Sequence, residues 1–496
     1  MNEGVNMSLS KSKYCEGIQC NKLLWLEINK QAEKDDLNNE SVFETGNEVG
    51  TLAKNLFGKY QDIPFNKDLN QMIKDTEKVI KDNKSVNITE ASFVYNNNFC
   101  SVDILRKNNN NYEIYEVKSS TNLKDIYIED ASYQYYVLTM LNYNVTKVSI
   151  VHINSNYIRK DKLDLDKLFT IVDITDKCKE RINYVKEKII EINNCLDNKN
   201  EPEDSIDFHC MNPYPCPFFN YCTRNLSKPN VFSIAGMSFK DKIKFYNKEL
   251  YKYEDLLKED INWKYKEQIE YTLNNKIDKI EKNNIKDFLS TLTYPLYYLD
   301  FETFQQAIPK YKGIKPYEQI PFQYSLHYKN SVCDKLNHLE YLAEEGVDPR
   351  RKLAERLVKD IPKDVCVLAY NMSFEKTVIK NLAETFPDLR EHLLNIRDNI
   401  KDLMVPFYNR NYYSKEMNGS YSIKYVLPAL FPNDEALNYH NLDEVHNGSE
   451  AMNAYAKLST LDEKEKQKLR NNLLKYCELD TFAMVKIHEK LMEVVD

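Results

Sequence analysis

Apolar and polar positions follow regular periods at a few places along the chain, and these places predict its main elements. Residues 295–301, PLYYLDF, form a short apolar run typical of a buried strand. Residues 92–121 hold apolar stretches separated by runs of Asn, which predicts a strand, a turn and a second strand. Apolar positions recur at helical spacing within residues 461–491, and again within residues 231–292 among dense Lys and Glu. We therefore expect an α/β protein in which one or two long helices over 231–292 form a spacer.

Acidic residues accompany these elements in the C-terminal third of the chain. Asp300 and Glu302 are two apart in the predicted strand, so both side chains project from one face. Tyr476 and Asp480 are four apart in the predicted C-terminal helix and share a helix face. Glu375 lies in YNMSFEK, a sequence typical of a helix start. Each fragment alone is more often an ordinary polar position, but their joint order favours a site that holds two Mg²⁺ or Mn²⁺ ions roughly 4 Å apart for phosphodiester hydrolysis.

This pattern resembles the motifs of the DEDD exonucleases, which have an RNase H-like fold, in the subtype whose third motif carries tyrosine. The metal-binding acids implied by the resemblance are Asp300, Glu302, Glu375 and Asp480. Tyr476 matches the tyrosine that orients the attacking water. Glu375 departs from the family, because the second motif usually ends in Asp, which is one methylene shorter. Asp402, in NIKDLMVPF, is either a further acid of the kind the family often has or a helix N-cap.

Composition and charge restrict the classes of function. The chain has 496 residues, 42% of them hydrophobic, and is long enough for about two to four domains. Its formal net charge of −8 and its pI near 5.7 argue against a protein that coats polyanions, because such binding needs clustered Lys and Arg. No apolar run approaches the roughly 20 residues of a membrane span, and the N-terminal residues lack the apolar core of a signal peptide. We therefore expect a cytoplasmic protein without a membrane partner.

The chain contains eleven cysteines, and their spacing indicates a metal site. Disulfides are not expected in the cytoplasm, so the spacing of the cysteines is examined for metal ligands. Seven are scattered and are interpreted as ordinary residues. Cys210, Cys216 and Cys222 are regularly spaced in the proline-containing segment HCMNPYPCPFFNYC, and Cys20 is the best candidate for a fourth ligand. On spacing alone, these four cysteines suit zinc as well as an iron–sulfur cluster.

A second set of polar residues lies between Cys20 and the later cysteines. Asp103 falls on the earlier of the two strands predicted within residues 92–121, and Glu116 and Lys118 share one face of the later strand. Two acids can hold Mg²⁺, and a lysine can orient water or offset charge on a phosphate. A Glu-x-Lys sequence alone is a weak signal in this chain. The preceding Asp and the following helix with Gln134 strengthen it.

This half resembles the RecB-type nucleases of the PD-(D/E)XK superfamily, in particular their iron–sulfur branch. The catalytic residues implied by the resemblance are Asp103, Glu116, Lys118 and Gln134, with Asp103 and Glu116 as metal ligands. In that branch one early cysteine and three late ones enclose the nuclease core, and the matching residues here are Cys20, Cys210, Cys216 and Cys222. The resemblance therefore implies a 4Fe-4S cluster in preference to zinc. One departure is Leu138, which stands where the family usually has a tyrosine four residues after the glutamine.

The whole layout resembles a bacterial two-domain family of unassigned function. It implies a restriction-endonuclease-like nuclease domain with a 4Fe-4S cluster over residues 1–230, a helical spacer over 231–292, and an RNase H-like exonuclease domain with a mixed sheet over 293–496. We expect a metal-dependent DNA nuclease, in DNA repair or in defence against foreign DNA, with a partner such as a helicase for unwinding. Two alternatives stay open. One is an RNA exonuclease, because no feature detects a 2′-hydroxyl; the other is a nucleic-acid-binding scaffold whose nuclease sites have decayed.

Overall fold

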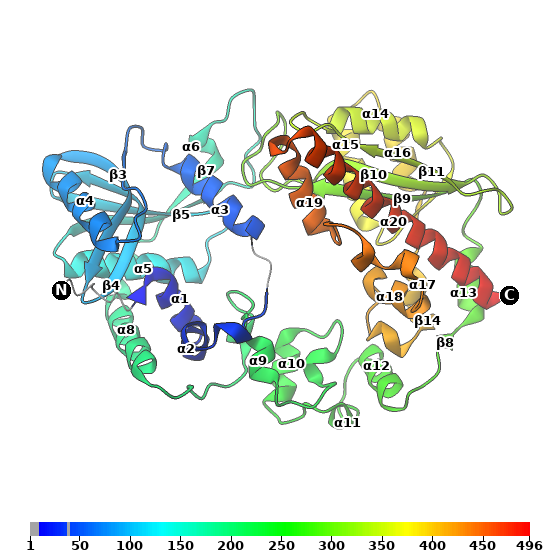
Figure 1. Cartoon of the computed structure of the whole chain (residues 1–496), viewed down its shortest axis with the longest axis horizontal. Coiled ribbons are helices and arrows are strands. Elements are labelled where there is room, and N and C mark those ends of the chain that lie inside the picture. The colour runs from blue at the N-terminus through cyan, green and yellow to red at the C-terminus, as the bar shows by residue number, and fades with distance from the viewer. Residues whose placement is uncertain (1–8, 37–39) are drawn as a thin grey trace. The chain divides into compact units, whose positions relative to one another are not determined.

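The computed structural model describes residues 9–36 and 40–496 and divides the chain into two compact units (Figure 1). Unit 1 extends to Leu226 and includes Gln306–Glu318, and unit 2 consists of Ser227–Gln305 and Gln319–Asp496. Both units combine strands and helices, which confirms the predicted α/β class. Residues 231–292, predicted as a spacer, fall within unit 2 in this division.

Unit 1 is built on a seven-stranded sheet with the strand order β2-β3-β4-β5-β6-β7, and β1 pairs with β4 outside this order. The strands are β1 (Leu9–Ser10), β2 (Gln61–Asp62), β3 (Ser85–Tyr95), β4 (Asn98–Asn108), β5 (Asn111–Lys118), β6 (Asn144–Ile153) and β7 (Phe169–Asp173). The pairs β3–β4 and β4–β5 are antiparallel. Asn96, Asn97 and Asn109 turn the chain between them with positive φ, a conformation that Asn tolerates well. The strand and turn prediction for residues 92–121 is therefore confirmed.

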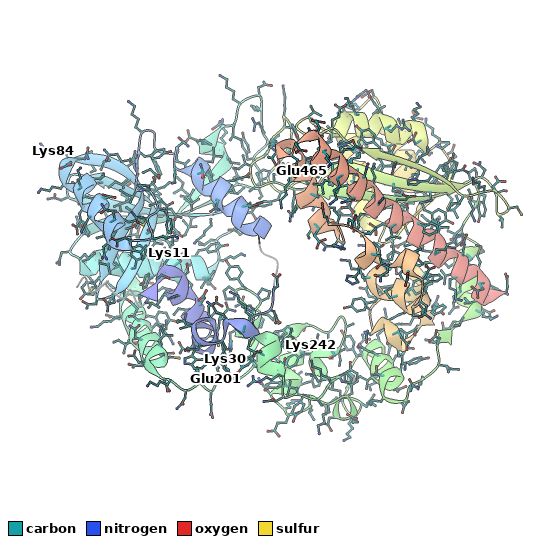
Figure 2. All side chains as sticks on the ribbon, in the orientation of Figure 1. Lys11, Lys30, Lys84, Glu201, Lys242 and Glu465 are labelled. Carbon is teal, nitrogen blue, oxygen red and sulfur yellow. The ribbon has the colours of Figure 1, made fainter. Side chains whose placement is uncertain are left out.

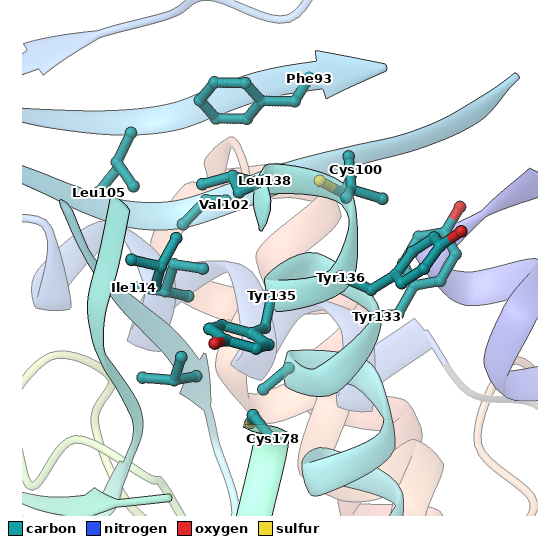
Figure 3. Close-up of a cluster of buried hydrophobic side chains, with 14 of the residues drawn as sticks. Phe93, Cys100, Val102, Leu105, Ile114, Tyr133, Tyr135, Tyr136, Leu138 and Cys178 are labelled. Carbon is teal, nitrogen blue, oxygen red and sulfur yellow. The ribbon is translucent and has the colours of Figure 1, made fainter. Parts of the chain in front are cut away.

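The buried helix α5 (Asp125–Met140) connects the parallel strands β5 and β6. Side chains alternate along the strands, so Leu105 and Ile114 join the core that surrounds α5 (Figure 3). Ile104 and Tyr115 project to the other face, where they pack with residues of α3 (Glu40–Ala53). Further helices of unit 1 are α1 (Lys11–Gln19), α2 (Asn21–Asn29), α4 (Leu69–Asp82), α6 (Leu165–Leu168), α7 (Thr175–Glu180), α8 (Ile182–Asp197) and α9 (Phe219–Thr223). Helices α1 and α8 both pack against α5.

Unit 2 contains a mixed five-stranded sheet in the order β11-β10-β9-β12-β13. The strands are β9 (Leu296–Phe304), β10 (Ile320–Lys329), β11 (Asn337–Leu342), β12 (Cys366–Ala369) and β13 (Ile400–Asp402). β9 is the central strand. It pairs with β10 in the antiparallel and with β12 in the parallel direction. The strand predicted over 295–301 is thus confirmed, and it lies in the middle of the sheet.

The alternation of β9 decides where the acidic residues lie. Tyr297 and Leu299 project into a core that also includes residues of α14 (Arg350–Asp360), α15 (Ser373–Thr385) and α16 (Arg390–Asp398). Leu296 and Tyr298 project to the opposite face, into a core that includes residues of α20 (Glu463–Val495). Asp300 continues the second set, so it belongs to the face covered by α20. The helical pattern predicted over 461–491 is confirmed by α20.

The spacer prediction of one or two long helices is wrong. Residues 231–292 instead form short helices, α10 (Phe239–Tyr246), α11 (Tyr253–Leu256), α12 (Trp263–Leu273) and α13 (Lys282–Leu289), and the strand β8 (Lys279–Ile280). Glu249 and Asn275 have positive φ between these elements and break the helical course. The apolar residues gather in a small core of their own that includes Val231, Leu256 and Ile269. The helical periodicity of residues 231–292 therefore came from several short helices that share a small core.

Unit 2 contains further helices and the strand β14, which pairs with β8 in a separate two-stranded sheet. They are α14 (Arg350–Asp360), α15 (Ser373–Thr385), α16 (Arg390–Asp398), α17 (Val405–Tyr408), β14 (Tyr412–Tyr413), α18 (Ile423–Leu430) and α19 (Gly448–Lys457). Within the described part of the chain, no helix combines the length and the apolar character needed to cross a membrane.

Candidate metal centres

Three acids of unit 2 meet between β9 and α20. One carboxylate oxygen from each of Asp300, Glu302 and Asp480 lies within 4.8 Å of the other two. Asp300 and Glu302 come from the same face of β9, and Asp480 comes from the helix that covers this face. Glu302 is buried, whereas Asp300 and Asp480 are partly exposed. The arrangement offers hard oxygen ligands at a spacing suited to a divalent cation.

Glu375 lies in the first turn of α15, as predicted, and is 2% exposed. Its Oε2 atom is buried without a hydrogen-bond partner among the described residues. A buried carboxylate oxygen of this kind is costly unless a proton or a cation is bound to it. Glu375 is not part of the group of three acids within 4.8 Å, but its charge raises the pKa of Asp300 and Glu302. It therefore acts electrostatically on the same site.

Two tyrosines contact Asp480. Tyr439 donates a hydrogen bond of 2.6 Å to Oδ1 of Asp480. Burial raises the pKa of Asp480, and the nearby hydroxyl groups of Tyr439 and Tyr476, the latter one helical turn before Asp480, lower it. The i, i+4 relation predicted for Tyr476 and Asp480 is thus present. Tyr439 begins a single-turn 3-10 helix, Tyr439–Asn441, and has no local sequence signal that could have identified it.

Asp402 positions the loop that precedes α15. Its carboxylate accepts hydrogen bonds from the backbone N–H groups of Asn371, Met372 and Met404, at 3.0, 3.2 and 3.0 Å. Asn371 has a φ of 70°, so this loop turns sharply before the helix. The helix N-cap interpretation of Asp402 is wrong, because Asp402 ends β13 and the N-cap of α17 is Met404. Its carboxylate instead holds the loop that leads into the helix carrying Glu375.

Burial and mutual repulsion disfavour the ionised form of the acids in unit 2. Burial and the neighbouring Asp480 raise the pKa of Glu302 well above its ordinary value. Burial raises the pKa of Asp480 to about 6 and that of Glu375 to about 8. Exposed Lys424 is the basic residue whose charge lowers the pKa of Glu302 and Asp480. The site therefore favours bound protons or bound cations.

A cavity of about 420 Å³ adjoins Glu302. Its lining includes Phe374 at the start of α15, Lys424 of α18 and Asn447 before α19. An aromatic ring and an ammonium group beside acidic residues can receive a base and a phosphate. The cavity is thus a candidate place for a nucleotide next to the acids.

The acids predicted in unit 1 also meet. Asp103 of β4 accepts a hydrogen bond of 2.7 Å from the backbone N–H of Val117. Lys118 donates to Oε1 of Glu116 at 2.8 Å, so the two side chains share one face of β5 as predicted. Gln134 of α5 donates to Oε2 of Glu116 at 2.7 Å. The residues predicted from the sequence are therefore neighbours in one buried polar cluster.

Sequence reasoning missed two members of this cluster. Lys11, which begins α1 (Figure 2), lies between the acids, with its Nζ atom 3.3 Å from Oδ1 of Asp103 and 3.0 Å from Oε1 of Glu116. Asp130 accepts hydrogen bonds from Lys118 at 2.6 Å and from Gln134 at 3.0 Å. Asp130 and Gln134 are four apart on α5, a spacing that could have revealed the acid. Lys11 is 105 residues from Glu116 and had no such signal.

Lysines neutralise the cluster in unit 1. Burial, together with the charges of Asp103 and Asp130, raises the pKa of Glu116 to about 7. Although burial opposes it, the charge of Lys118 lowers the pKa of Asp130 below its usual range. The nearby acids likewise raise the pKa of Lys11 and Lys118 against the effect of burial. These acids of unit 1 form ion pairs with lysines. Among the described residues, no such ion pair is formed by the four acids of the unit 2 site, which are Asp300, Glu302, Glu375 and Asp480.

The four predicted cysteines line one small cavity. Cys20, between α1 and α2, faces the cavity together with Cys210, Cys216 and Cys222. Burial raises the pKa of all four thiols. The sulfur of Cys20 donates to Asp204 at 3.1 Å, and these two residues and His209 form a group of possible ligands within 4.8 Å. The four sulfur atoms do not form such a group.

The comparisons with known proteins reveal relatives without an assigned activity. Residues 297–422 match a family described as a domain of unknown function (DUF2779). An uncharacterized protein of Mycoplasma genitalium is 26% identical over 459 aligned residues, covering 78% of this chain and 67% of the relative. An uncharacterized protein of Ureaplasma parvum is 28% identical over 264 residues, covering 49% of this chain and 38% of the relative. The family match covers β9 to β13 and includes Asp300, Glu302 and Glu375.

The pKa values of the acids predict how pH acts on unit 2. A carboxyl group whose pKa is raised by folding stabilises the folded state at low pH, and this contribution is lost as pH rises toward the folded pKa. The cation-free protein should therefore lose thermal stability between about pH 5 and about pH 8, because Glu375 has a pKa of about 8. Mn²⁺ should raise the unfolding temperature more at the higher pH. Calorimetry of the full chain measures both effects, and Glu375→Gln should weaken the pH dependence. An equal effect of Mn²⁺ at both pH values would contradict ligation by these acids.

We expect Cys210→Ser to remove bound metal and to destabilise unit 1, because Cys210 lines the cavity shared with Cys20. Cys333→Ser is the matched control, since Cys333 is exposed in unit 2. Metal analysis and calorimetry of protein purified without oxygen measure the outcome. Unchanged metal content in Cys210→Ser would exclude this residue as a ligand. Stoichiometric zinc with no iron and no absorbance at about 400 nm would exclude an iron–sulfur cluster.

Proposed function

We propose that this chain is a metal-dependent nuclease of the cytoplasm that hydrolyses DNA at two separate sites. Unit 2 would be an RNase H-like 3′–5′ exonuclease domain of the tyrosine-containing DEDD type. Unit 1 would be a restriction-endonuclease-like domain with a PD-(D/E)XK site. The observation that carries the proposal is the group formed by Asp300, Glu302 and Asp480 with Tyr476 beside it. A mixed sheet with β9 at its centre is also the arrangement expected of an RNase H-like domain.

The residues of unit 2 have distinct proposed roles. Asp300, Glu302, Glu375 and Asp480 would hold two Mg²⁺ or Mn²⁺ ions. When bound, such ions activate water and stabilise the leaving oxygen. Tyr476 would hold the attacking water in line with the phosphate, since its hydroxyl lies beside Asp480. Tyr439 would fix the orientation of Asp480 through its hydrogen bond. Phe374 and Lys424 in the adjoining cavity would contact the terminal nucleotide.

The cluster of unit 1 supports a second hydrolytic site. Asp103 and Glu116 would bind the divalent cation, and Lys118 would act on the attacking water or the phosphate. Gln134 would support Glu116, to which it donates a hydrogen bond. Lys11 now lies between the two acids. An incoming divalent cation would meet this ammonium group, so cation binding and movement of Lys11 should be coupled.

A 4Fe-4S cluster is the proposed cofactor of the four cysteines. A single tetrahedral zinc ion, with Zn–S bonds of about 2.3 Å, brings its four sulfurs within about 4 Å of one another. The sulfurs of Cys20, Cys210, Cys216 and Cys222 line one cavity without approaching this closely as a group. A cluster that assigns one thiolate to each of four irons holds the sulfurs further apart, which favours it over zinc. It would tie Cys20 to residues about 190 positions later and restrain the unfolded chain.

Two other functions remain to be separated from this proposal by experiment. An RNA exonuclease would use the same acids of unit 2, and no described contact selects against a 2′-hydroxyl. A nucleic-acid-binding scaffold would bind without cleavage, but both sets of acids predicted for hydrolysis are intact. DNA repair or defence against foreign DNA is the proposed setting, with a helicase-like partner. Degradation of labelled single-stranded DNA, double-stranded DNA and RNA with Mn²⁺ distinguishes the three functions.

In unit 2, substitution of a metal ligand and substitution of Tyr476 should have different effects on cation binding and on the rate of hydrolysis. Asp300→Ala should abolish both Mn²⁺ binding at this site and hydrolysis, because it removes a ligand. Tyr476→Phe should keep metal and substrate binding and lose rate by roughly one to three powers of ten if orientation of water is its task. Tyr425→Phe, at an exposed tyrosine of α18, is the control. The measurement is release of mononucleotides from a free 3′ end in an Asp103→Ala background. Cleavage of circular DNA in this background would contradict the exonuclease assignment.

Lys118→Ala should remove most turnover at unit 1 while cation binding remains, because lysine acts on water and phosphate. The measurement is DNA cleavage and Mn²⁺ binding in a background that carries Asp300→Ala and Glu302→Ala. Lys84→Ala is the control, since Lys84 is exposed and lies just before β3 (Figure 2). Cleavage by Lys118→Ala at the rate of its background would remove Lys118 from the catalytic set.

A further inference from the structure

A histidine cluster of unit 2 lies outside the proposed nuclease residues. His327 of β10 and His338 of β11 are direct partners across the antiparallel strand pair. Their rings stack with centroids 4.5 Å apart. Glu478 of α20 completes the cluster, and one possible ligand atom from each of the three residues lies within 4.8 Å of the others. Three separate elements thus bring two imidazoles and a carboxylate together.

A chain of hydroxyl groups determines which ring nitrogens can accept a cation. His338 Nε2 is 2.9 Å from Ser325 Oγ, and Ser325 Oγ is 2.7 Å from Thr481 Oγ1. Thr481 in turn donates to the backbone carbonyl of Glu478 at 3.1 Å. His327 Nδ1 is 2.8 Å from the same Thr481 oxygen. All these contacts are satisfied together if Nε2–H of His338 and Nδ1–H of His327 are the donors.

This proton arrangement leaves lone pairs on Nδ1 of His338 and Nε2 of His327. Histidines that bind metals characteristically donate their other ring N–H to an oxygen, which fixes the tautomer. His338 Nδ1 lies 3.8 Å from Oε1 of Glu478, too far for a hydrogen bond. Two ligand atoms about 2.1 Å from one tetrahedral ion are about 3.4 Å apart, so a small movement of the exposed Glu478 side chain would bring it into range.

We propose that His327, His338 and Glu478 form a binding site for one Zn²⁺ ion, with water as the fourth ligand. Two neutral imidazoles and a carboxylate suit zinc better than Mg²⁺, which prefers oxygen ligands. His327 is buried, and the side chains of His338 and Glu478 are 23% and 49% exposed, so an ion can enter from solvent. The site does not depend on the nuclease proposal.

The ion would tie two strands of the sheet to α20. Thr481 supports both histidines and directly follows Asp480 in the helix. Zinc binding would therefore fix the position of α20 relative to β10 and β11, close to Tyr476 and Asp480. The histidines lie on strands other than β9, which carries Asp300 and Glu302, so this ion would be separate from the proposed nuclease ions.

Titration of the metal-free full chain with Co²⁺ and Zn²⁺ tests the site. Co²⁺ bound by nitrogen and oxygen gives visible absorption without the near-ultraviolet charge transfer of thiolate ligands, so the cysteines are distinguished. We expect one such Co²⁺ per chain, displaced by Zn²⁺. It should be lost in His338→Gln and bind about tenfold or more weakly in Glu478→Gln, which changes an exposed side chain. His440→Gln, at an exposed histidine outside the cluster, should bind as the unchanged chain does.

Calorimetry provides a second measurement. Zn²⁺ should raise the unfolding temperature of unit 2 in the unchanged chain and in His440→Gln, but not in His338→Gln. Equal Co²⁺ binding by His338→Gln and the unchanged chain would overturn the proposal. It would also be overturned if all bound Co²⁺ showed thiolate charge transfer, in which case the histidines form only a hydrogen-bonded stack.

Discussion

Mutual repulsion among buried carboxylates is the constraint on which both candidate centres depend. Removing a carboxylate from water is costly unless a proton, a cation or hydrogen-bond donors compensate its charge. The two units compensate in different ways. In unit 1, Lys11 and Lys118 form ion pairs with Glu116. In unit 2, Tyr439 donates a hydrogen bond to Asp480, and the Tyr476 hydroxyl and the charge of Lys424 also lower the pKa of this acid.

This difference has consequences for chemistry. In unit 1, Asp130 remains ionised beside Lys118, whereas burial raises the pKa of Glu116 to about 7. An added divalent cation must therefore compete with lysine and also displace a proton from Glu116. The acids of unit 2 have raised pKa values and must lose protons when a cation binds. In unit 2, bound metal ions would therefore offset the repulsion among the carboxylates, a task that lysines share in unit 1. A stable fold nevertheless forms because β9 and α20 bury extensive apolar surface beside the acids, including Tyr298, Met484 and Leu491.

The sequence predicted those parts of the sites that depend on local periodicity. Asp300 and Glu302 share a face because β-strands alternate, and Tyr476 and Asp480 share a face because they are one helical turn apart. Lys11 and Tyr439 could not be predicted in this way, because their contacts join segments 105 and 41 residues apart. Only the folded chain brings such residues together, and single lysines or tyrosines carry no signal in a chain with 36 tyrosines.

The same limit explains the error over residues 231–292. Helical spacing was present there, but positive φ at Glu249 and Asn275 divided the segment into short helices. Asn275 is of a type that tolerates positive φ, but it is one of many asparagines in the chain, and Glu249 is not of such a type, so neither position was a distinct signal. Local patterns thus identified elements that are buried in a sheet or packed along it, such as β9 and α20. They were less informative where short elements fold onto one another.

Binding of two divalent ions by the acids of unit 2 can be observed by anomalous X-ray diffraction from crystals of the full chain grown with Mn²⁺. We expect two anomalous peaks about 4 Å apart, in contact with Asp300, Glu302, Glu375 and Asp480. Mn²⁺ bound at other acids of the chain, with no peak beside Asp300 and Asp480, would contradict this expectation.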